Sequence, residues 1–367
     1  MIINANALSI PLAAKSVHTI VTSPPYYGLR DYGTAKWEGG DPNCDHKYST
    51  ARNDGGRVNT SGFHGSAKED SDKGDMNYRG VCPKCGAIRI DEQIGLEQTP
   101  DEYIANLVAV FRECKRILRD DGTLWVNIGD SYNGSGGAGG DYAKGGLKEG
   151  QPKYPGRNIQ SVKPKDLIGI PWMLAFALRA DGWYLRQDII WHKPNPMPES
   201  VKDRCTKAHE YIFLLTKSAR YYFDNEAIKE PAKNDSGWAK QIAKNGIPHQ
   251  HHKPGSVYLD PREECQYGLL TAKLTDTRNK RTVWTVTTKP YKGAHYATFP
   301  PDLIKPMILA GCPKGGIVLD PFVGSGTTVA TAIKLGRKGI GIDLNIKYLT
   351  ENARQRIAEA QMQPRLI

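Results

Sequence analysis

Residues 316–343 read GIVLDPFVGSGTTVATAIKLGRKGIGID, and this stretch decides the fold. An apolar run ends at Asp320 and is followed by a glycine-rich turn, a helical segment that begins at Thr327, and a second apolar run that ends at Asp343. This order predicts a strand, a turn, a helix and a second strand. The glycines allow a cofactor close to the backbone amides at the helix N-terminus, and no Gly-Lys-[Ser/Thr] follows them, which excludes a P-loop.

The rest of the chain repeats this alternation of strand and helix. Strands are expected at Thr19–Thr22, Thr123–Ile128, Leu185–Trp191, Glu210–Thr216, Gly316–Leu319 and Lys338–Ile342. Helices are expected at Pro100–Leu118, Leu167–Ala180, Asp302–Ala310, Thr327–Leu335 and Ile346–Ala360. The order predicts a doubly wound α/β fold with a mainly parallel sheet. The connection between residues 191 and 210 is too short for a helical crossover, so an antiparallel hairpin is expected at one sheet edge.

A second motif, Thr22-Ser23-Pro24-Pro25-Tyr26, directly follows the apolar run at 18–21. Its two prolines fix a stiff turn that offers carbonyl groups and no competing amide donors. Taken alone, the turn is also compatible with a plain loop after a strand. Its presence in one chain with the Asp320 motif favours a functional turn.

These two motifs resemble those of the DNA amino-methyltransferases that use S-adenosylmethionine, in the subgroup whose catalytic half precedes the cofactor half. The resemblance covers roughly residues 1–33, 91–223 and 283–359. Ser23 is the form associated with cytosine-N4 enzymes, whereas adenine-N6 enzymes more often carry an acidic residue there. The resemblance therefore implies a Rossmann-like methyltransferase fold and site-specific methylation of DNA, with cytosine N4 favoured and adenine N6 as the alternative.

The resemblance makes Ser23, Pro24, Pro25 and Tyr26 the catalytic residues. An exocyclic amine is a poor nucleophile because its lone pair is delocalised into the ring. Methyl transfer therefore needs acceptors that localise the lone pair and hold it in line with the sulfonium methyl. Ser23 Oγ and the Pro24 carbonyl are the natural acceptors, and Tyr26 can stack on a base extruded from the duplex.

The resemblance also implies the residues that bind S-adenosylmethionine. Asp320 lies where the amino-acid end of the cofactor would sit, and Asp343 is placed to accept from the ribose hydroxyls. Related enzymes often show Gly-Asp where this chain has Asn4-Ala5-Asn6, so a contact of Asn6 with the adenine stays open. The expected cofactor-binding residues are Asp320, Pro321, Phe322, Gly324, Gly326, Thr327, Thr328, Asp343, Thr298, Phe299, Pro300 and Asn6.

Residues 34–90 interrupt the alternation and contain the turn Cys82-Pro83-Lys84-Cys85-Gly86. Two thiolates in such a turn can bind one zinc ion, and Cys44 and His46 upstream can supply the other two ligands. A redox pair is the alternative for Cys82 and Cys85. Seven cysteines, an odd number, fit reduced thiols and metal binding better than a disulfide framework.

Two further polar insertions follow, and a net charge of +11 with a pI near 9.1 suits a polyanionic partner. Residues 133–165 are rich in glycine, without an assigned role. Residues 224–282 are basic and occupy the place of the target-recognition region, so we expect this segment to contact double-stranded DNA. Asp130 and Ser131, after a predicted strand, either line the base pocket or cap the sheet.

These features divide the chain into a catalytic half at 1–33 and 91–223, a zinc-binding insertion at 34–90, a recognition region at 224–282 and a cofactor half at 283–367. A DNA-binding module with an inactive scaffold and an RNA or small-molecule methyltransferase are the alternatives. The intact Ser23-Pro24-Pro25-Tyr26 turn argues against the first and the basic insertion against the second.

The start of the chain lacks the charged and apolar segments of a secretory signal, and no apolar stretch approaches the roughly 18 residues that cross a bilayer. A cytoplasmic protein of bacterial or phage origin, without a membrane partner, is therefore expected. The resemblance is compatible with a homodimer. It is also compatible with a cognate restriction nuclease that acts separately.

Overall fold

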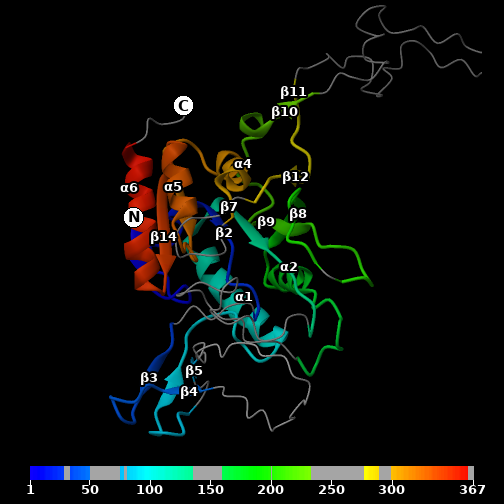
Figure 1. The fold of residues 1–367 in the computed structure, drawn as a ribbon. Coiled ribbons are helices and arrows are strands. Elements are labelled where there is room, and N and C mark those ends of the chain that lie inside the picture. Colours follow the sequence, from blue (N-terminus) through cyan, green and yellow to red (C-terminus); the bar gives the residue numbers. More distant parts are fainter. Residues whose placement is uncertain are drawn as a thin grey trace, which may run out of the picture.

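The computed structural model describes residues 1–28, 34–49, 75–77, 81–134, 159–199, 201–232, 277–288 and 299–362. Its centre is an eight-stranded sheet in the order β1-β14-β13-β2-β7-β9-β8-β12 (Figure 1). The strands are β1 (Ile2–Asn4), β2 (Val17–Thr22), β7 (Leu118–Ile128), β8 (Tyr184–His192), β9 (His209–Thr216), β12 (Val283–Thr285), β13 (Ile317–Asp320) and β14 (Lys338–Asp343). Strand β9 runs antiparallel to both neighbours and the other pairs are parallel, which confirms the predicted mainly parallel sheet.

The predicted hairpin forms, but it does not lie at the sheet edge. Strands β8 and β9 pair antiparallel from Tyr184 with Thr216 to His192 with His209. Beyond β8 the sheet continues with β12, which pairs parallel to it through Trp284 and Trp191. Strand β12 has three residues, too few for an alternating pattern to reveal it in the sequence.

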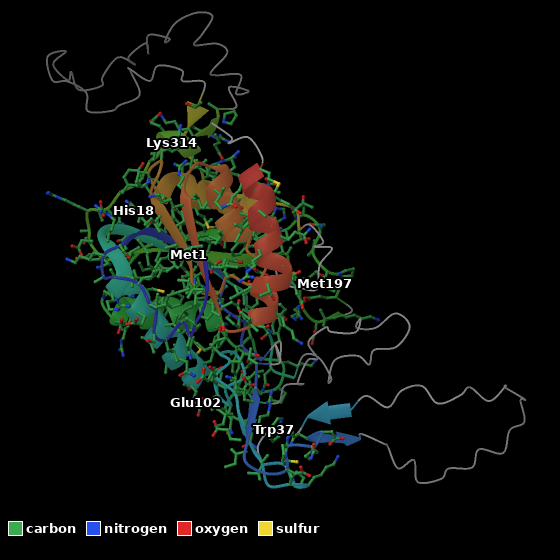
Figure 2. The ribbon with its side chains drawn as sticks, turned by 90° about the vertical axis from the view of Figure 1, so that its left-hand side faces the viewer. Met1, His18, Trp37, Glu102, Met197 and Lys314 are labelled. Atoms are coloured by element: carbon green, nitrogen blue, oxygen red, sulfur yellow. The ribbon has the colours of Figure 1, made fainter. Side chains whose placement is uncertain are left out.

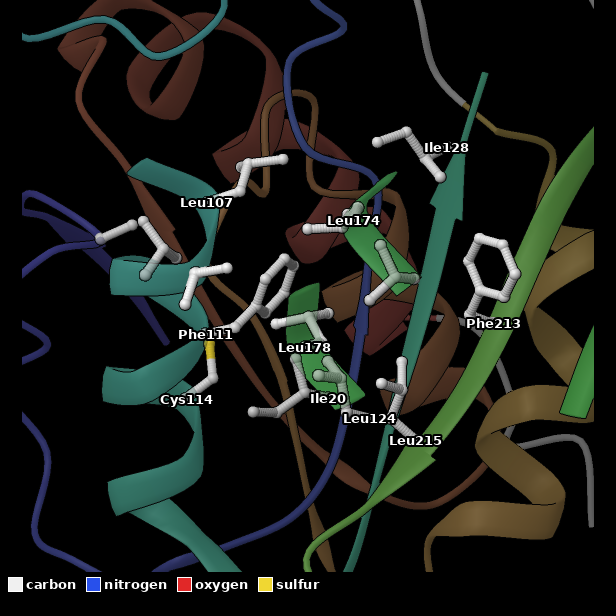
Figure 3. Close-up of a cluster of buried hydrophobic side chains, with 14 of the residues drawn as sticks. Ile20, Leu107, Phe111, Cys114, Leu124, Ile128, Leu174, Leu178, Phe213 and Leu215 are labelled. Carbon is white, nitrogen blue, oxygen red and sulfur yellow. The ribbon is translucent and has the colours of Figure 1, made fainter. Parts of the chain in front are cut away.

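Helices cover both faces of the sheet because its central strands alternate their apolar side chains between the two faces. On one face, Leu124 of β7 and Phe213 and Leu215 of β9 pack with helices α1 (Pro100–Ile117) and α2 (Ile170–Ala180). Figure 3 shows this cluster, in which Phe111 of α1 and Leu178 of α2 point toward the strands. These contacts form one half of the core.

The opposite face takes the intervening residues of the same strands. Trp125 of β7 and Ile212 and Leu214 of β9 pack with helix α4 (Pro301–Gly311). Helix α5 (Thr327–Lys334) lies against β14 so closely that a Cβ on Gly339 would come within 2.8 Å of Val329. The chain then forms a π-helical segment η2 (Tyr348–Ala353) and helix α6 (Arg354–Met362), where one helix over Ile346–Ala360 is expected.

Helix boundaries follow local capping chemistry. Helix α1 begins as predicted, because Thr99 and Glu102 form a reciprocal capping box and Pro100 occupies the first turn. Helix α2 begins at Ile170, three residues after its predicted start. Gly169 precedes it with φ 86°, a conformation that a helix cannot continue through.

The described part of the insertion projects from the sheet and its helices, and Trp37 marks it in Figure 2. Its described strands are β3 (Lys36–Glu38), β4 (Lys47–Ser49), β5 (Asp75–Asn77) and β6 (Ile88–Ile90), which pair antiparallel as β3 with β6 and β4 with β5. A second excursion contains η1 (Glu226–Ile228), β10 (Glu230–Pro231) and β11 (Thr277–Arg278). Within the described ranges, no helix has both the length and the apolar character that a membrane span requires.

Candidate active site

A cavity of about 700 Å³ opens at the carboxyl ends of β2, β13 and β14, where ligands bind in open α/β sheets. Twelve of the predicted catalytic and cofactor-binding residues line it: Asn6, Ser23, Pro24, Pro25, Tyr26, Phe299, Asp320, Pro321, Phe322, Gly324, Thr327 and Asp343. The two sequence motifs therefore share one cavity. Gly326, Thr328 and Pro300 are not among the described lining residues, and Thr298 lies outside the described residues.

The two motifs meet because β2 and β13 are neighbours in the sheet, with Leu319 opposite Ile20. At the end of these strands Thr22 Oγ1 donates a 2.7 Å hydrogen bond to Asp320 Oδ1. The turn that starts at Ser23 and the glycine-rich loop that starts at Pro321 leave the sheet side by side. The strand order thus juxtaposes segments almost 300 residues apart in the chain.

Asp320 is a buried carboxylate, and both of its oxygens accept hydrogen bonds from protein groups. Besides Thr22, Oδ1 accepts from the Phe322 backbone N–H at 3.0 Å, and Oδ2 accepts from Thr328 Oγ1 at 2.6 Å. Burial raises the pKa of Asp320 to about 6, against the opposing effect of the hydrogen bonds from Thr328 and Thr22. Thr328 therefore supports the cavity wall by holding Asp320 and does not form the wall itself.

The glycine-rich loop needs glycine at Gly326, which has φ 81° and would bring a Cβ within 3.1 Å of the Ala353 backbone. Arg356 of α6 donates to Ser325 Oγ at 3.0 Å and to Thr327 Oγ1 at 2.5 Å. The loop is thus held from the helix side while Ser325 and Thr327 still line the cavity. Sequence reasoning missed Arg356 because it lies on a helix beyond the motif.

Asp343 ends β14 at the opposite side of the glycine-rich loop. Its Oδ2 accepts from the Gly324 backbone N–H at 2.9 Å and its Oδ1 from the Asn345 N–H at 2.8 Å. Burial raises the pKa of this carboxylate. Each carboxylate oxygen has further acceptor capacity, so Asp343 can accept from ligand hydroxyls in the cavity.

The turn Ser23–Tyr26 is fixed by two tyrosines. Tyr103 of α1 donates a 2.7 Å hydrogen bond to the Pro25 carbonyl, and Tyr26 donates at 2.6 Å to Glu210 Oε2. Burial and Glu210 raise the Tyr26 pKa well above its ordinary value of 10, and the Ser23 side chain acts in the opposite direction. Tyr26 is therefore a neutral hydroxyl that donates. Gly129 leaves room for its ring, since a Cβ there would come within 2.6 Å of Tyr26 Cε2.

Glu210, Lys193 and Asn127 complete the wall beside Tyr26, and the sequence analysis missed all three. Glu210 pairs with Lys193 and accepts from Asn127 Nδ2 at 3.2 Å. The Lys193 ammonium also lies 4.3 Å from the centre of the Trp191 ring. A signal existed at Asn127, because a polar residue within the apolar run of β7 needs a buried partner.

Asn6 and Asp130, which the sequence left undecided, have different positions. Asn6 lines the cavity, where its Nδ2 donates to Glu92 Oε2 at 3.3 Å. The Asp130 carboxylate accepts from the Gly169 and Ile170 backbone N–H groups and so caps helix α2. Asp130 is not among the described residues that line the cavity. Its side chain serves the fold.

The insertion brings Cys44, His46, Cys82 and Cys85 together, with their ligand atoms all within 4.8 Å of one another. The sulfur atoms of Cys44 and Cys82 are 3.8 Å apart, and Cys85 Sγ lies 3.6 Å from His46 Nδ1. Four ligands at about 2.3 Å from a tetrahedral zinc are separated by about 3.8 Å. The donor set and its spacing therefore fit a closed zinc site. Trp37 stacks on His46 with ring centroids 4.3 Å apart.

In the described part of the predicted recognition region, several basic side chains form ion pairs with acidic residues of the same region. Arg278 and Arg281 both donate to Glu230 Oε1, at 3.0 and 2.6 Å, and Lys229 pairs with Glu226. These cations hold η1, β10 and β11 together. Most of the predicted region, residues 233–276, lies outside the described residues.

Known proteins resemble this chain in sequence and in architecture. A family model described as DNA methylase, N6_N4_Mtase, matches residues 17–354. The type II methyltransferase M.Cfr9I of Citrobacter freundii is 40% identical over 353 residues, which cover 94% of this chain and 83% of that protein. M.SmaI of Serratia marcescens is 40% identical over 332 residues, covering 90% and 80%.

A solved structure gives the same result for the fold. The PvuII DNA methyltransferase, described as cytosine-N4-specific, superimposes with a TM-score of 0.51 at 14% identity, covering 100% of this chain and 87% of its own. This likeness concerns the arrangement of strands and helices. On the family match and the relatives at 40% identity, the chain belongs to the N6_N4_Mtase family of DNA methylases and is an amino-methyltransferase of this type.

Proposed function

We propose that the protein transfers a methyl group from S-adenosylmethionine to the exocyclic amine of a base flipped out of duplex DNA, with cytosine N4 as the target. The observation that carries this proposal is the hydrogen bond between Thr22 and Asp320, which holds the Ser23 turn beside the glycine-rich loop in one cavity. A donor bound along the loop and a base bound at the turn would meet there.

The cofactor side of the cavity offers the chemistry that S-adenosylmethionine needs. Asp343 lines the cavity with acceptor capacity for the ribose hydroxyls, and Asp320, at the end of β13, would face the amino-acid end of the cofactor. The buried Phe299 supplies an apolar wall for the methionine part. The structure of TTHA0409 from Thermus thermophilus, complexed with S-adenosyl-L-methionine, has this fold, with a TM-score of 0.50 at 18% identity. When bound, the sulfonium supplies an electrophilic methyl group.

The amine side consists of Ser23 Oγ and one prolyl carbonyl. The Pro25 carbonyl is engaged by Tyr103, so the Pro24 carbonyl is the acceptor left for the base. An acceptor pair localises the amine lone pair and orients it toward the methyl. Tyr26 offers its ring for stacking while its hydroxyl is held by Glu210.

Cytosine N4 is the proposed target because the hydroxyl of Ser23 occupies the place at which adenine-N6 enzymes more often carry an acid. Mass spectrometry of nucleosides from unmethylated plasmid DNA, incubated with the protein and S-adenosylmethionine, identifies the product. N4-methylcytosine supports the proposal. N6-methyladenine assigns the alternative target, and the absence of any methylated nucleoside under conditions where the cofactor binds favours an inactive DNA-binding module.

For the insertion, we propose a structural zinc ion bound by Cys44, His46, Cys82 and Cys85. Support comes from four soft or borderline donors whose ligand atoms lie within 4.8 Å of one another, which is the full set of protein ligands of a closed structural site. The ion would hold the two ends of the insertion together. The catalytic cavity needs no metal, because the reaction carries its own electrophile.

For residues 224–282 we propose contact with the duplex, in line with the net charge of +11. Competition between duplex DNA and RNA for the protein tests this proposal. Preference for RNA would contradict it.

A further inference from the structure

The Glu210 carboxylate is the one charged group in contact with Tyr26 among the described residues, and methyl transfer as proposed above uses it only to hold the Tyr26 hydroxyl. It lies in the cavity wall, 15% exposed, and accepts from Tyr26 Oη at 2.6 Å. Its second oxygen pairs with Lys193, and Lys207 adds a further positive charge nearby. Removing a carboxylate from water costs several kcal/mol of folding free energy. A neutral acceptor could hold the Tyr26 hydroxyl without this cost, so the charge of Glu210 calls for a further explanation.

Methyl transfer to an exocyclic amine releases a proton. A C–N bond forms, the C–S bond of the sulfonium breaks, and its electron pair stays on sulfur as a thioether. The nitrogen becomes positively charged and must lose one of its hydrogens to become a neutral methylamine. Ser23, which contacts the amine in the proposed function, carries a neutral hydroxyl and cannot keep this proton.

Hydroxyl groups lie between the amine site and Glu210. Ser23, Tyr26 and Glu210 line the same cavity, the Ser23 side chain interacts with the Tyr26 hydroxyl, and Tyr26 donates to Glu210 at 2.6 Å. With the amine N–H donating to Ser23 Oγ, each oxygen in this chain accepts one hydrogen and donates the next. The order of donors ends on Oε2 of Glu210, which accepts from Tyr26 Oη.

We propose that Glu210 is the acceptor of the amine proton, which reaches it through the hydroxyls of Ser23 and Tyr26 as the C–N bond forms. This inference rests on the proposed function. Asn127, which donates to the same Oε2 at 3.2 Å, fixes the direction of the carboxylate, and Lys193 pairs with its other oxygen. The proton then passes from Glu210 to water at the mouth of the cavity.

Glu210→Gln keeps the shape and an acceptor for Tyr26 but removes the basic carboxylate. Tyr26→Phe keeps the ring and interrupts the chain of hydroxyls. Single-turnover incorporation of tritiated methyl groups from S-adenosylmethionine into unmethylated plasmid DNA should fall by about 10²-fold in each variant, the lower end of the effect of general acid and base groups. Cofactor affinity by calorimetry and plasmid affinity by filter binding should stay at the wild-type value. Asp188→Asn, on the exposed face of the same hairpin, is the matched control and should retain the wild-type rate.

Rescue of the methylation rate by added formate distinguishes a proton acceptor from a residue with a structural role only. Formate should restore part of the rate in Glu210→Ala, which leaves space for a carboxylate, and none in Tyr26→Phe. The proposal is overturned if wild-type protein methylates the plasmid and Glu210→Gln does so at the same rate, or if Glu210→Gln loses cofactor or plasmid affinity in proportion to its rate. A wild-type protein that binds S-adenosylmethionine and leaves the plasmid unmethylated would instead contradict the proposed function.

Discussion

Thr22 and Asp320 are joined by a 2.7 Å hydrogen bond across 298 residues of sequence. The bond links the last residue of β2 to the last residue of β13, so it marks the point where the Ser23 turn and the glycine-rich loop leave the sheet. Both side chains are buried, and Asp320 also holds Thr328 and the Phe322 amide. The carboxylate thus fixes the relative position of the two motifs before any ligand binds.

The first prediction concerns the pH dependence of stability. Asp320 has a folded-state pKa of about 6, above the roughly 3.9 of an unfolded aspartate. The folded state therefore binds the proton more tightly, and the burial of this carboxylate costs stability progressively as pH rises from about 4 to about 6. The total cost is about 3 kcal/mol, of which about half falls above pH 5.

Asp320→Asn removes this titration. Urea unfolding of wild type and variant near pH 5 and near pH 7.5 should therefore show a smaller loss of unfolding free energy in the variant, by about 1 to 2 kcal/mol. All other titrating groups are common to both proteins and cancel in the comparison. Equal pH dependence in the two proteins would show that Asp320 titrates normally.

Asp343→Ala should weaken S-adenosylmethionine binding by about tenfold or more. The lost hydrogen bonds from ribose hydroxyls to a charged acceptor contribute roughly 1.5 to 3 kcal/mol. Isothermal calorimetry with Asp188→Ala as the control measures the effect. Unchanged affinity would remove Asp343 from the cofactor site.

Purified protein should contain about one zinc ion per chain, and Cys82→Ser should release it, because a closed four-ligand site loses most of its affinity with one thiolate. Cys205→Ser, which changes an exposed cysteine outside the cluster, should retain the metal. Metal analysis of protein prepared without chelators makes the comparison. Wild-type protein free of zinc would argue for the redox alternative at Cys82 and Cys85.

The sequence predicted those strands and helices whose ends are determined by nearby residues in the chain. Strand β13 and the turn after Asp320 carry both the apolar run and the glycines, and the capping residues before α1 fix its start at Pro100. Strands β1 and β12 were missed because three residues carry no periodic signal, and β12 displaced the hairpin from the edge. The start of α2 depended on the backbone of Gly169 and on a cap from Asp130, far away in the chain.

The sequence predicted the parts of the candidate site that lie in one continuous motif. It did not predict the residues that only the folding of distant segments brings to the site. Ser23 to Tyr26 and Asp320 to Thr327 are recognisable as short runs, whereas Glu210 looks like the polar start of an ordinary strand. Only the pairing of β9 with β7 brings Glu210 to Asn127 and Tyr26. Such a contact depends on register, which the sequence alone did not specify.

The measurement that most directly tests the central claim is the single-turnover methylation rate of Ser23→Ala. The substitution removes one acceptor from the amine and leaves the Pro24 carbonyl, the Tyr26 ring and the cofactor loop in place. An interaction made mainly in the transition state lowers kcat far more than it weakens binding. We predict a loss of about 10²-fold or more, with S-adenosylmethionine affinity unchanged and with the exposed-serine control Ser9→Ala at the wild-type rate. Methylation of DNA by Ser23→Ala at the wild-type rate would contradict the assignment of this turn as the catalytic site.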